Sequence, residues 1–378
     1  MPYITIPRTP KIYHLTIDDI LNGIDPSVYL TNENTNDTFT YWCDVVSNRI
    51  TSVCDIHGMI QDIKNWNERH SALFEADRHT LYHSFKIPKS KGGWRQIDAP
   101  LDPLMIALRE LRDILQYKCY GRYHSSAFAY IKGRCAVDAV KRHQKNESRW
   151  FLKLDFSNFF GSTTPEFVEQ QLRLVYPFSA IYQNKEGATE LNKALSLCFL
   201  NGGLPQGTPI SPLLTNIMMI PIDMEITRYV RNVKPHLVYT RYADDLLISG
   251  RYSFIWSEVQ NELNKILSKY NAPFQIKPEK TRYGSSAGRN WNLGVMLNKD
   301  NEITVGHKRK KQLKMQLFNF MKSYQDGNPW SLEDVQALNG IISYYRSIEK
   351  DNIDTIINSY SEKFNYPVMK VIKELISA

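Results

Sequence analysis

The sequence has few of the features that mark a secreted, disulfide-linked or membrane protein. Its 378 residues include five cysteines, with no C-x-x-C pair and no zinc-type spacing, so we expect reduced thiols. The first fifteen residues, MPYITIPRTPKIYHL, lack the apolar stretch of a signal peptide. The most apolar segment, 209–222, contains Pro212 and Pro221 and is too short to cross a bilayer. We therefore expect a cytoplasmic protein with no membrane partner.

Internal repeats, low-complexity tracts and an excess of acidic residues are also absent. Lysine and arginine total 47 against 39 acidic residues, which gives a formal net charge of +8. A basic balance favours an anionic partner such as nucleic acid, although many basic proteins bind none. The hydrophobic content of 42% is ordinary for a globular protein, and the length allows two or three domains.

The segment YTRYADDLLISG (239–250) places Asp244 and Asp245 side by side in a run that otherwise has strand character. Aspartate is a poor strand former and adjacent like charges repel, so the pair fits best at the tip of a hairpin. There the carboxylates could converge on divalent cations that assist a phosphoryl transfer. In FLKLDFSNFF, Asp155 ends an apolar strand and offers a third carboxylate. The alternative is that the pair are turn residues and that Asp155 caps a helix near Thr163.

Other segments have clear local patterns. FKIPKSKGGWRQIDAP (85–100) predicts two strands around a glycine turn, and an amphipathic helix follows at 101–117. GLPQGTPISPLLTN (203–216) predicts a loop and an apolar helix, with a kink at Pro221. From His307 onward the pattern is helical, and Ser331 is a candidate N-cap.

Taken in order, these motifs resemble those of bacterial reverse transcriptases. YADD is similar to their catalytic box, FLKLDFSNFF to the first catalytic strand, and GLPQGTPISPLLTN to the loop and helix between them. IPKSKGGWRQIDAP resembles the fingers motif, and SSAFAYIKGRCAVDAV resembles the motif after it. The resemblance implies an α+β right-hand polymerase fold with fingers, a palm of antiparallel sheet and helices, and a helical thumb. Its expected divisions are an N-terminal extension (1–75), fingers and palm (76–300) and thumb (301–378).

The resemblance also implies site residues. Asp155, Asp244 and Asp245 would hold two Mg²⁺ ions, with Mn²⁺ as an alternative, and Lys280 would protonate the leaving pyrophosphate. The residues implied to contact the incoming nucleotide are Arg95, Lys89, Lys91, Phe160, Gln206, Gly207 and Tyr242, the last of these beneath the primer end. The residues implied to contact nucleic acid are Trp291, Lys308, Arg309, Lys310 and Lys311.

Phe160 has a specific expected role, because an aromatic side chain there would clash with a ribose 2′-hydroxyl and select dNTPs. The alternative is a core aromatic beside Phe159. For the lysines the alternative is a solvated surface charge.

The implied function is RNA-directed DNA polymerisation, in which dNTPs are added to the 3′-hydroxyl of a DNA or RNA primer. A partner noncoding RNA and a role in anti-phage defence are expected, as in retron-like and abortive-infection enzymes. The chain has DAVKRH (138–143) where retron enzymes have Asn-Ala-x-x-His, and NLG (292–294) where they have Val-Thr-Gly. Two alternatives stay open: a protein-primed or template-independent nucleotidyl transferase, and a catalytically inactive RNA-binding polymerase fold. The sequence indicates no oligomeric state.

Overall fold

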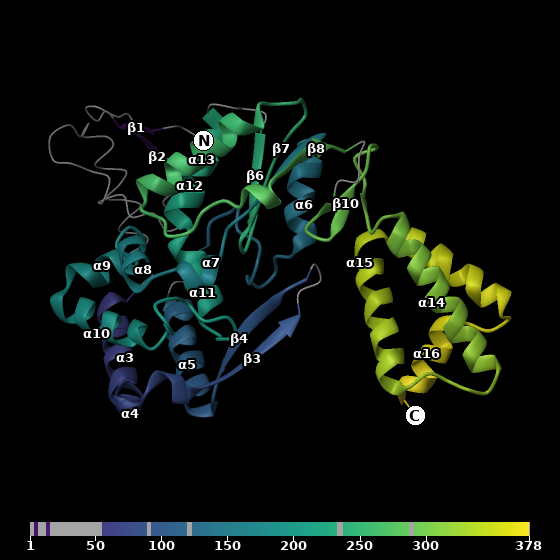
Figure 1. Ribbon diagram of the computed structural model, residues 1–378, viewed down its shortest axis with the longest axis horizontal. Coiled ribbons are helices and arrows are strands. Elements are labelled where there is room, and N and C mark those ends of the chain that lie inside the picture. Colours follow the sequence, from purple (N-terminus) through teal and green to yellow (C-terminus); the bar gives the residue numbers. More distant parts are fainter. Residues whose placement is uncertain are drawn as a thin grey trace. The chain divides into compact units, whose positions relative to one another are not determined.

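The computed structural model describes residues 4–6, 13–15, 55–88, 92–118, 123–232, 237–286 and 291–377 (Figure 1). Its contacts divide the chain into two compact units. The first unit comprises Met1–Arg134, Leu152–Ile248 and Ile255–Arg282. The second comprises Cys135–Phe151, Ser249–Phe254 and Tyr283–Ala378. Both units are discontinuous in sequence, whereas the expected divisions were consecutive stretches, and those divisions stay a prediction.

The first unit contains the β1–β2, β3–β4 and β6–β7 strand pairs and most of the described helices. Its elements before the central sheet are β1 (Ile4–Ile6), β2 (Tyr13–Leu15), α3 (Ile56–Arg69), α4 (Ser71–Glu75), η2 (Arg78–Leu81), β3 (Tyr82–Pro88), β4 (Trp94–Pro100) and α5 (Asp102–Lys118). Strands β3 and β4 pair antiparallel from Tyr82 opposite Pro100 to Pro88 opposite Trp94, as the sequence predicted. The predicted stripe of α5 is also confirmed, since Leu104, Leu108, Leu111 and Leu115 are fully buried.

A four-stranded sheet forms the centre of the fold, with strand order β6-β7-β5-β8. These strands are β5 (Trp150–Asp155), β6 (Leu237–Tyr242), β7 (Asp245–Gly250) and β8 (Arg282–Ser285). Apolar residues of β5 and β7, such as Leu152 and Ile248, are fully buried. The charged ends of these strands carry the site described below.

The remaining helices of the first unit are α7 (Phe159–Ser162), α8 (Pro165–Leu172), α9 (Phe178–Gln183), α10 (Lys185–Ser196), α11 (Ser211–Met218), α12 (Ile220–Asn232), α13 (Trp256–Lys269) and η3 (Pro278–Lys280). Helix α11 is buried along nearly its whole length, as its apolar sequence requires. It ends at Met218 with Met219 as its C-cap, and Pro221 lies in the first turn of α12, where its missing N–H is tolerated. The expected kink at Pro221 is therefore a break between two helices.

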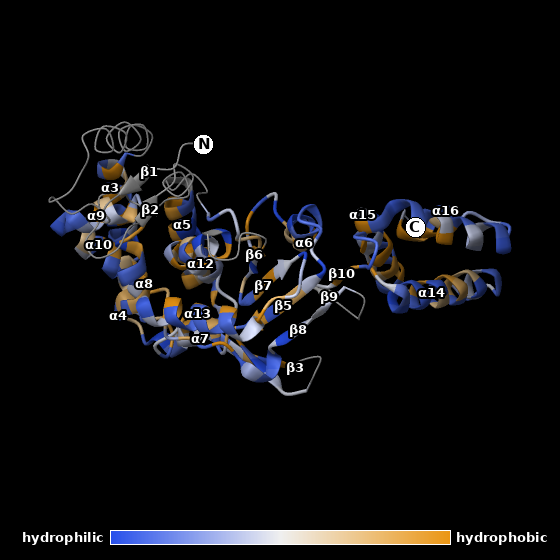
Figure 2. Ribbon diagram, turned by 90° about the horizontal axis from the view of Figure 1, so that it is seen from above, coloured by the Kyte–Doolittle hydropathy of each residue, from blue (hydrophilic) through white to orange (hydrophobic). Residues whose placement is uncertain are grey.

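The second unit contains α6 (Ala136–Lys145), β9 (Trp291–Asn292), β10 (Val295–Leu297), β11 (Ile303–Thr304), α14 (His307–Gln325), α15 (Leu332–Lys363) and α16 (Val368–Ser377). Strands β9, β10 and β11 form an antiparallel sheet. Helices α14 to α16 share an apolar core that includes Leu317, Leu338, Ile357 and Val371. Figure 2 shows hydrophobic and hydrophilic residues interleaved along α14 and α16, as amphipathic helices require.

Helix α15 begins as predicted, with Ser331 as the N-cap that accepts a hydrogen bond from the backbone N–H of Asp334. The 32 residues of α15 comprise two helices that join across a kink at Glu349, which has φ −144° and ψ 70°. The second of these helices contains Ile353 and Ile357, as the apolar pattern of the sequence predicts.

No helix in the described part of the chain is both long and apolar enough to cross a membrane. Among the cysteines that the structure describes, Cys198 is buried and Cys135 is exposed.

Candidate active site

The two adjacent aspartates lie at a hairpin tip, as the sequence predicted. Tyr242 ends β6, Asp245 begins β7, and Ala243 and Asp244 form the turn between them. Ala243 has φ 57°, a left-handed conformation that is unusual for a residue other than glycine. The turn thus redirects the chain immediately before Asp244.

Asp155 is held beside this turn by the neighbouring strand. It is the last residue of β5, and the backbone N–H of Phe156 donates to the carbonyl of Asp244 at 3.2 Å. The structure therefore brings together three carboxylates from two segments that are almost ninety residues apart. The alternative role of Asp155 as a helix cap is wrong, because α8 starts after Thr164, whose own side chain caps it.

The carboxylates perturb one another. Burial, together with the charge of Asp155, raises the pKa of Asp244. Loss of surrounding water and the charges of Asp244 and Asp155 raise the pKa of Asp245 to about 6, although this residue is exposed overall. Concentrated negative charge of this kind is typical of sites that bind cations.

Two lysines neutralise part of that charge. The Lys280 Nζ donates to both carboxylate oxygens of Asp155, at 2.8 and 2.7 Å, and the Lys277 Nζ lies 3.3 Å from Oδ1. Burial tends to lower the pKa of Lys280, but the hydrogen bond and charge of Asp155 outweigh it and raise that pKa. The nearby Arg282 guanidinium donates instead to the carbonyls of Glu279 and Thr281.

No group of three histidine, cysteine or acidic side chains is arranged as a ready metal cage within the described residues. The oxygen donors of Asp155, Asp244 and Asp245 are nevertheless of the type that Mg²⁺ prefers. Magnesium also commonly takes only one or two carboxylates from a protein and the rest from water and phosphates. The chemistry of the donor set fits the expected ion.

Phe160 and Phe159 have different surroundings. Phe159 is 2% exposed and its ring packs on Phe156 and Phe274, with centroids 5.5 and 4.9 Å away. Phe160 is half-buried and meets Phe159 edge-on at 5.5 Å. The core-aromatic interpretation thus applies to Phe159, whereas the ring of Phe160 stays accessible.

The LPQG loop packs against the β3–β4 hairpin. The backbone N–H of Asp98 donates to the carbonyl of Gln206 at 2.8 Å. Gly207 has φ +126°, and a Cβ there would lie 2.9 Å from the Asp98 carbonyl oxygen. The close approach that requires this glycine is therefore to β4, whereas the sequence interpretation placed it at the ligand.

Arg95 is exposed on β4, and the predicted lysines Lys89 and Lys91 lie outside the described residues. The backbone of Trp291 belongs to β9, but its side chain is also outside them.

The basic run that opens α14 divides into two kinds of residue. Lys308 and Lys311 are exposed, as is Lys314 one turn later. The Lys310 Nζ pairs with Glu349 at 2.6 Å, and the Arg309 guanidinium donates to the carbonyl of Gly294. Two members of the predicted nucleic-acid contact therefore have partners inside the second unit.

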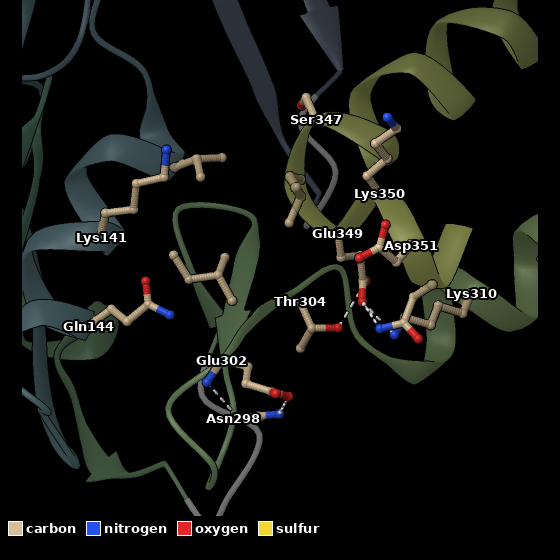
Figure 3. Close-up of a pocket in the computed structure, with 14 residues that line it drawn as sticks. Lys141, Gln144, Asn298, Glu302, Thr304, Lys310, Ser347, Glu349, Lys350 and Asp351 are labelled. Carbon is tan, nitrogen blue, oxygen red and sulfur yellow. Dashed lines mark hydrogen bonds and ion pairs between the residues drawn. The ribbon is translucent and has the colours of Figure 1, made fainter. Parts of the chain in front are cut away.

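A cavity of about 480 Å³ lies in the second unit and contains none of the three aspartates (Figure 3). It is lined by Lys141 and Gln144 of α6, by residues of the β10–β11 hairpin, and by the break in α15. Figure 3 shows Glu349 facing Thr304 and Lys310. The Glu349 carboxylate accepts hydrogen bonds from Thr304 Oγ1 at 2.9 Å and from the backbone N–H of Val305 at 2.8 Å. These contacts account for the non-helical backbone at Glu349.

The segment DAVKRH lies in α6, where its distinctive side chains have structural partners. Asp138 caps the helix by accepting from the N–H of Cys135 at 3.1 Å. His143 is fully buried with its Nδ1 2.6 Å from Ser249 Oγ, and burial lowers its pKa to about 3.

Three residues near the hairpin were missed by the sequence interpretation. Lys153 is half-buried two positions before Asp155, and burial lowers its pKa to about 8 against the opposing charge of Asp245. Tyr130 is 58% exposed with φ 61°, and the charge of Asp244 contributes, after burial, to its raised pKa. Arg241 is fully buried. The signal for Lys153 and Arg241 was a positive charge inside an apolar strand.

Comparison with known proteins agrees with these motifs. The family described as "Reverse transcriptase (RNA-dependent DNA polymerase)" matches residues 87–316. Retron Ec83 reverse transcriptase of Escherichia coli is 30% identical over 301 residues, which are 77% of this chain and 90% of that protein. Retron Ec73 reverse transcriptase of the same species is 24% identical over 288 residues, or 74% and 87% of the two chains.

Among solved structures, telomerase from Candida tropicalis in complex with a TWJ fragment of telomeric RNA is similar, with a TM-score of 0.44 and 14% identity. The similarity covers 82% of this chain and 62% of that one.

The chain belongs to the reverse transcriptase family and has the family's right-hand polymerase fold. Within the family it is of the bacterial retron type, and it is an RNA-directed DNA polymerase. The departures at DAVKRH and NLG therefore occur within a retron-type chain.

Proposed function

We propose that the chain adds dNTPs to a primer 3′-hydroxyl by a metal-dependent phosphoryl transfer at the three aspartates. An RNA template would direct the choice of each nucleotide. The observation that carries this proposal is the position of Asp244 at the β6–β7 turn, hydrogen-bonded through its backbone to the residue after Asp155. The fold thereby presents hard oxygen ligands at one point, next to two lysines.

Asp155, Asp244 and Asp245 would hold Mg²⁺, with Mn²⁺ as an alternative. Bound divalent cations would supply charge stabilisation for the attacking and leaving oxygens of the transfer. The hydrogen bond and charge of Asp155 raise the pKa of Lys280 and so favour its ammonium form, which would attract the departing pyrophosphate and donate a proton to it. The Asp155–Lys280 pair would also keep the carboxylate oriented.

The surrounding residues would orient the nucleotide. The exposed guanidinium of Arg95 suits bidentate contact with the triphosphate, and Lys89 and Lys91 would add positive charge. Gln206 and Gly207 would place the LPQG loop beside the base, and Tyr242 would support the primer end. The accessible ring of Phe160 would occupy the space that a ribose 2′-hydroxyl needs.

A partner noncoding RNA would serve as template, since the relatives with the highest identity above are retron reverse transcriptases. The net charge of +8 supports an anionic partner of this kind. A role in anti-phage defence belongs to the same proposal. Sequencing the nucleic acid that copurifies with the protein would identify the template, and a random RNA population would contradict a dedicated partner.

Primer extension on an RNA template tests the chemistry. Asp155→Asn and Asp244→Asn each remove one charge with almost no change in volume, so extension should be abolished while the fold and RNA binding survive. Asp326→Asn, at an exposed helix end, is the matched control and should extend normally. Labelled product on the protein itself, or without template, would support the transferase alternative. An active Asp244→Asn enzyme would refute the site.

A further inference from the structure

A buried ion pair lies directly behind the catalytic hairpin. Arg241 of β6 and Asp223 of α12 both have fully buried side chains. The Arg241 Nε lies 3.0 and 3.1 Å from the two carboxylate oxygens of Asp223, and Nη2 lies 2.8 Å from Oδ2. The Tyr239 hydroxyl donates to the same carboxylate at 2.7 Å. Asp223 therefore fixes the orientation of the guanidinium.

The remaining nitrogen of Arg241 reaches the turn itself. Its Nη1 donates to the carbonyl oxygen of Ala243 at 3.3 Å and to Asn216 Oδ1 at 3.2 Å. Ala243 is the residue with left-handed backbone that immediately precedes Asp244. A fixed donor on its carbonyl restrains the peptide plane that leads into the catalytic carboxylate.

The same arginine is tied to the loop before α6. Its backbone N–H donates to Ser126 at 2.7 Å, and its carbonyl accepts from Phe128 at 2.9 Å. Asn216 of α11 in turn donates through Nδ2 to the carbonyl of Ala129 at 2.9 Å. Arg241 thus connects the turn, α11 and α12 through its guanidinium, and this loop through its backbone.

A gain in folding stability alone does not explain why the buried Arg241–Asp223 pair is present. Replacing a buried ion pair by apolar residues of similar volume is often neutral or stabilising, because both charges lose their hydration on burial. An apolar pair would fill the space but would leave the Ala243 carbonyl without its donor.

We propose that Arg241, anchored by Asp223, is a positioning residue that sets the Asp244 carboxylate by holding the carbonyl of Ala243. The inference rests on the proposed role of Asp244 in catalysis. Misplacement of a reacting group by about 1 Å can cost a reaction roughly 100-fold, so a loosened turn should have a measurable effect.

The test compares three variants of the full chain in primer extension, with kcat, KM for the template–primer and the Mg²⁺ concentration of half-maximal rate as readouts. Arg241→Lys keeps the charge but loses the fork, Asp223→Asn weakens the anchor, and the double variant Arg241→Met/Asp223→Leu replaces the pair with apolar groups. Arg173→Met, which removes an exposed ion pair with Glu169 on α8, is the control.

The expected result is a fall in kcat of at least about tenfold and a higher Mg²⁺ requirement in all three variants, with KM for template–primer unchanged. The double variant should unfold at a temperature near that of the native protein. A folded double variant with native kcat and Mg²⁺ dependence would overturn the proposal. If the double variant does not fold, Asp223→Asn decides by the same criterion. Asp244→Asn is run in parallel, because activity there would refute the site itself rather than the positioning role.

Discussion

Lys280 and Asp155 form a two-pronged ion pair, with the Lys280 Nζ 2.8 and 2.7 Å from the two carboxylate oxygens. The residues are 125 positions apart in sequence. They meet because Ser157 donates to the carbonyl of Gln275 at 2.7 Å, and Lys277 to the carbonyl of Asp155 at 2.8 Å. This short pairing places η3, and with it Lys280, beside the end of β5.

The Asp155–Lys280 pair predicts a proton-transfer defect in Lys280→Met. The variant should lose about 100-fold in kcat, a typical contribution of a general acid, with a much smaller change in KM for dNTP. Single-turnover incorporation measures this loss. Lys277→Met is the matched control, because its Nζ forms an ion pair with the same carboxylate at 3.3 Å but is not the proposed proton donor. Equal losses in the two variants would show that positive charge alone matters.

The raised pKa of Asp245 predicts that charge in the site lowers the stability of the metal-free protein. A carboxyl whose pKa is about 6 when folded and 3.8 ordinarily binds its proton more tightly in the folded state. The stabilisation that this protonated carboxyl contributes is therefore lost as the pH rises from about 4 to about 6, and none of it remains above that range. Asp245→Asn should raise the free energy of unfolding at pH 7.5 by about 1 kcal/mol, a figure already reduced for solvent screening of this exposed residue.

Urea denaturation in EDTA at pH 7.5 and pH 4 measures this difference. The stabilisation by Asp245→Asn should shrink at pH 4, where the native carboxyl is protonated, and Asp326→Asn should change little at either pH. A variant that is less stable than the native protein at pH 7.5 would show that Asp245 makes favourable contacts which outweigh the repulsion.

Local patterns in the sequence were sufficient for the parts of the fold that depend on nearby residues. The glycine turn between β3 and β4, the leucine stripe of α5 and the N-cap at Ser331 all follow from backbone preference and side-chain periodicity. The hairpin tip at Asp244 follows from the cost of charge within a strand.

Long-range pairs could not be predicted in this way, because nothing in the spacing of Lys280 identifies Asp155 as its partner. The break in α15 at Glu349 has the same origin, since it depends on Thr304, Val305 and Lys310 of a preceding segment. Arg241 left a weak signal, as it is the one charge within the strand LVYTRY and a buried charge requires a partner. The sequence indicates that such a charge needs a partner, but it does not identify the partner residue.

The contrast between two adjacent phenylalanines predicts separate effects on sugar choice and stability. Phe160→Ala should open space for a 2′-hydroxyl, so rNTP incorporation should rise relative to dNTP incorporation while some dNTP use survives. Phe159→Ala should instead destabilise the protein by about 3–5 kcal/mol, because it removes a ring from the aromatic cluster. Incorporation from competing dNTPs and rNTPs measures the effect on sugar choice, and thermal unfolding measures the effect on stability. Undiminished rejection of rNTPs by a folded Phe160→Ala enzyme would place the gate elsewhere.

The exposed lysines of α14 predict a sequence-independent interaction with nucleic acid. Lys308, Lys311 and Lys314 lie on the solvent side of the helix, whereas Leu313 and Leu317 face its core. Replacing the three lysines with glutamine should weaken template–primer binding alike for all sequences, since phosphates carry no base information. The slope of log K against log salt should flatten by about 0.9 for each phosphate that the variant no longer neutralises.

Lys310 provides the internal control, because its charge is used within the second unit. Lys310→Met leaves the carboxylate of Glu349 without its cation, although Thr304 and Val305 still donate to it. This variant should have a lower unfolding temperature and a salt slope near the native value. The triple glutamine variant should instead have a flatter salt slope and an unfolding temperature near the native value. Binding isotherms at several salt concentrations, together with thermal unfolding of both variants, separate a phosphate-binding role from a structural ion pair. A native salt slope in the triple variant would make these lysines a solvated face, and the phosphate-binding surface that the net positive charge supports would then have to lie on other residues, such as Arg95 of β4.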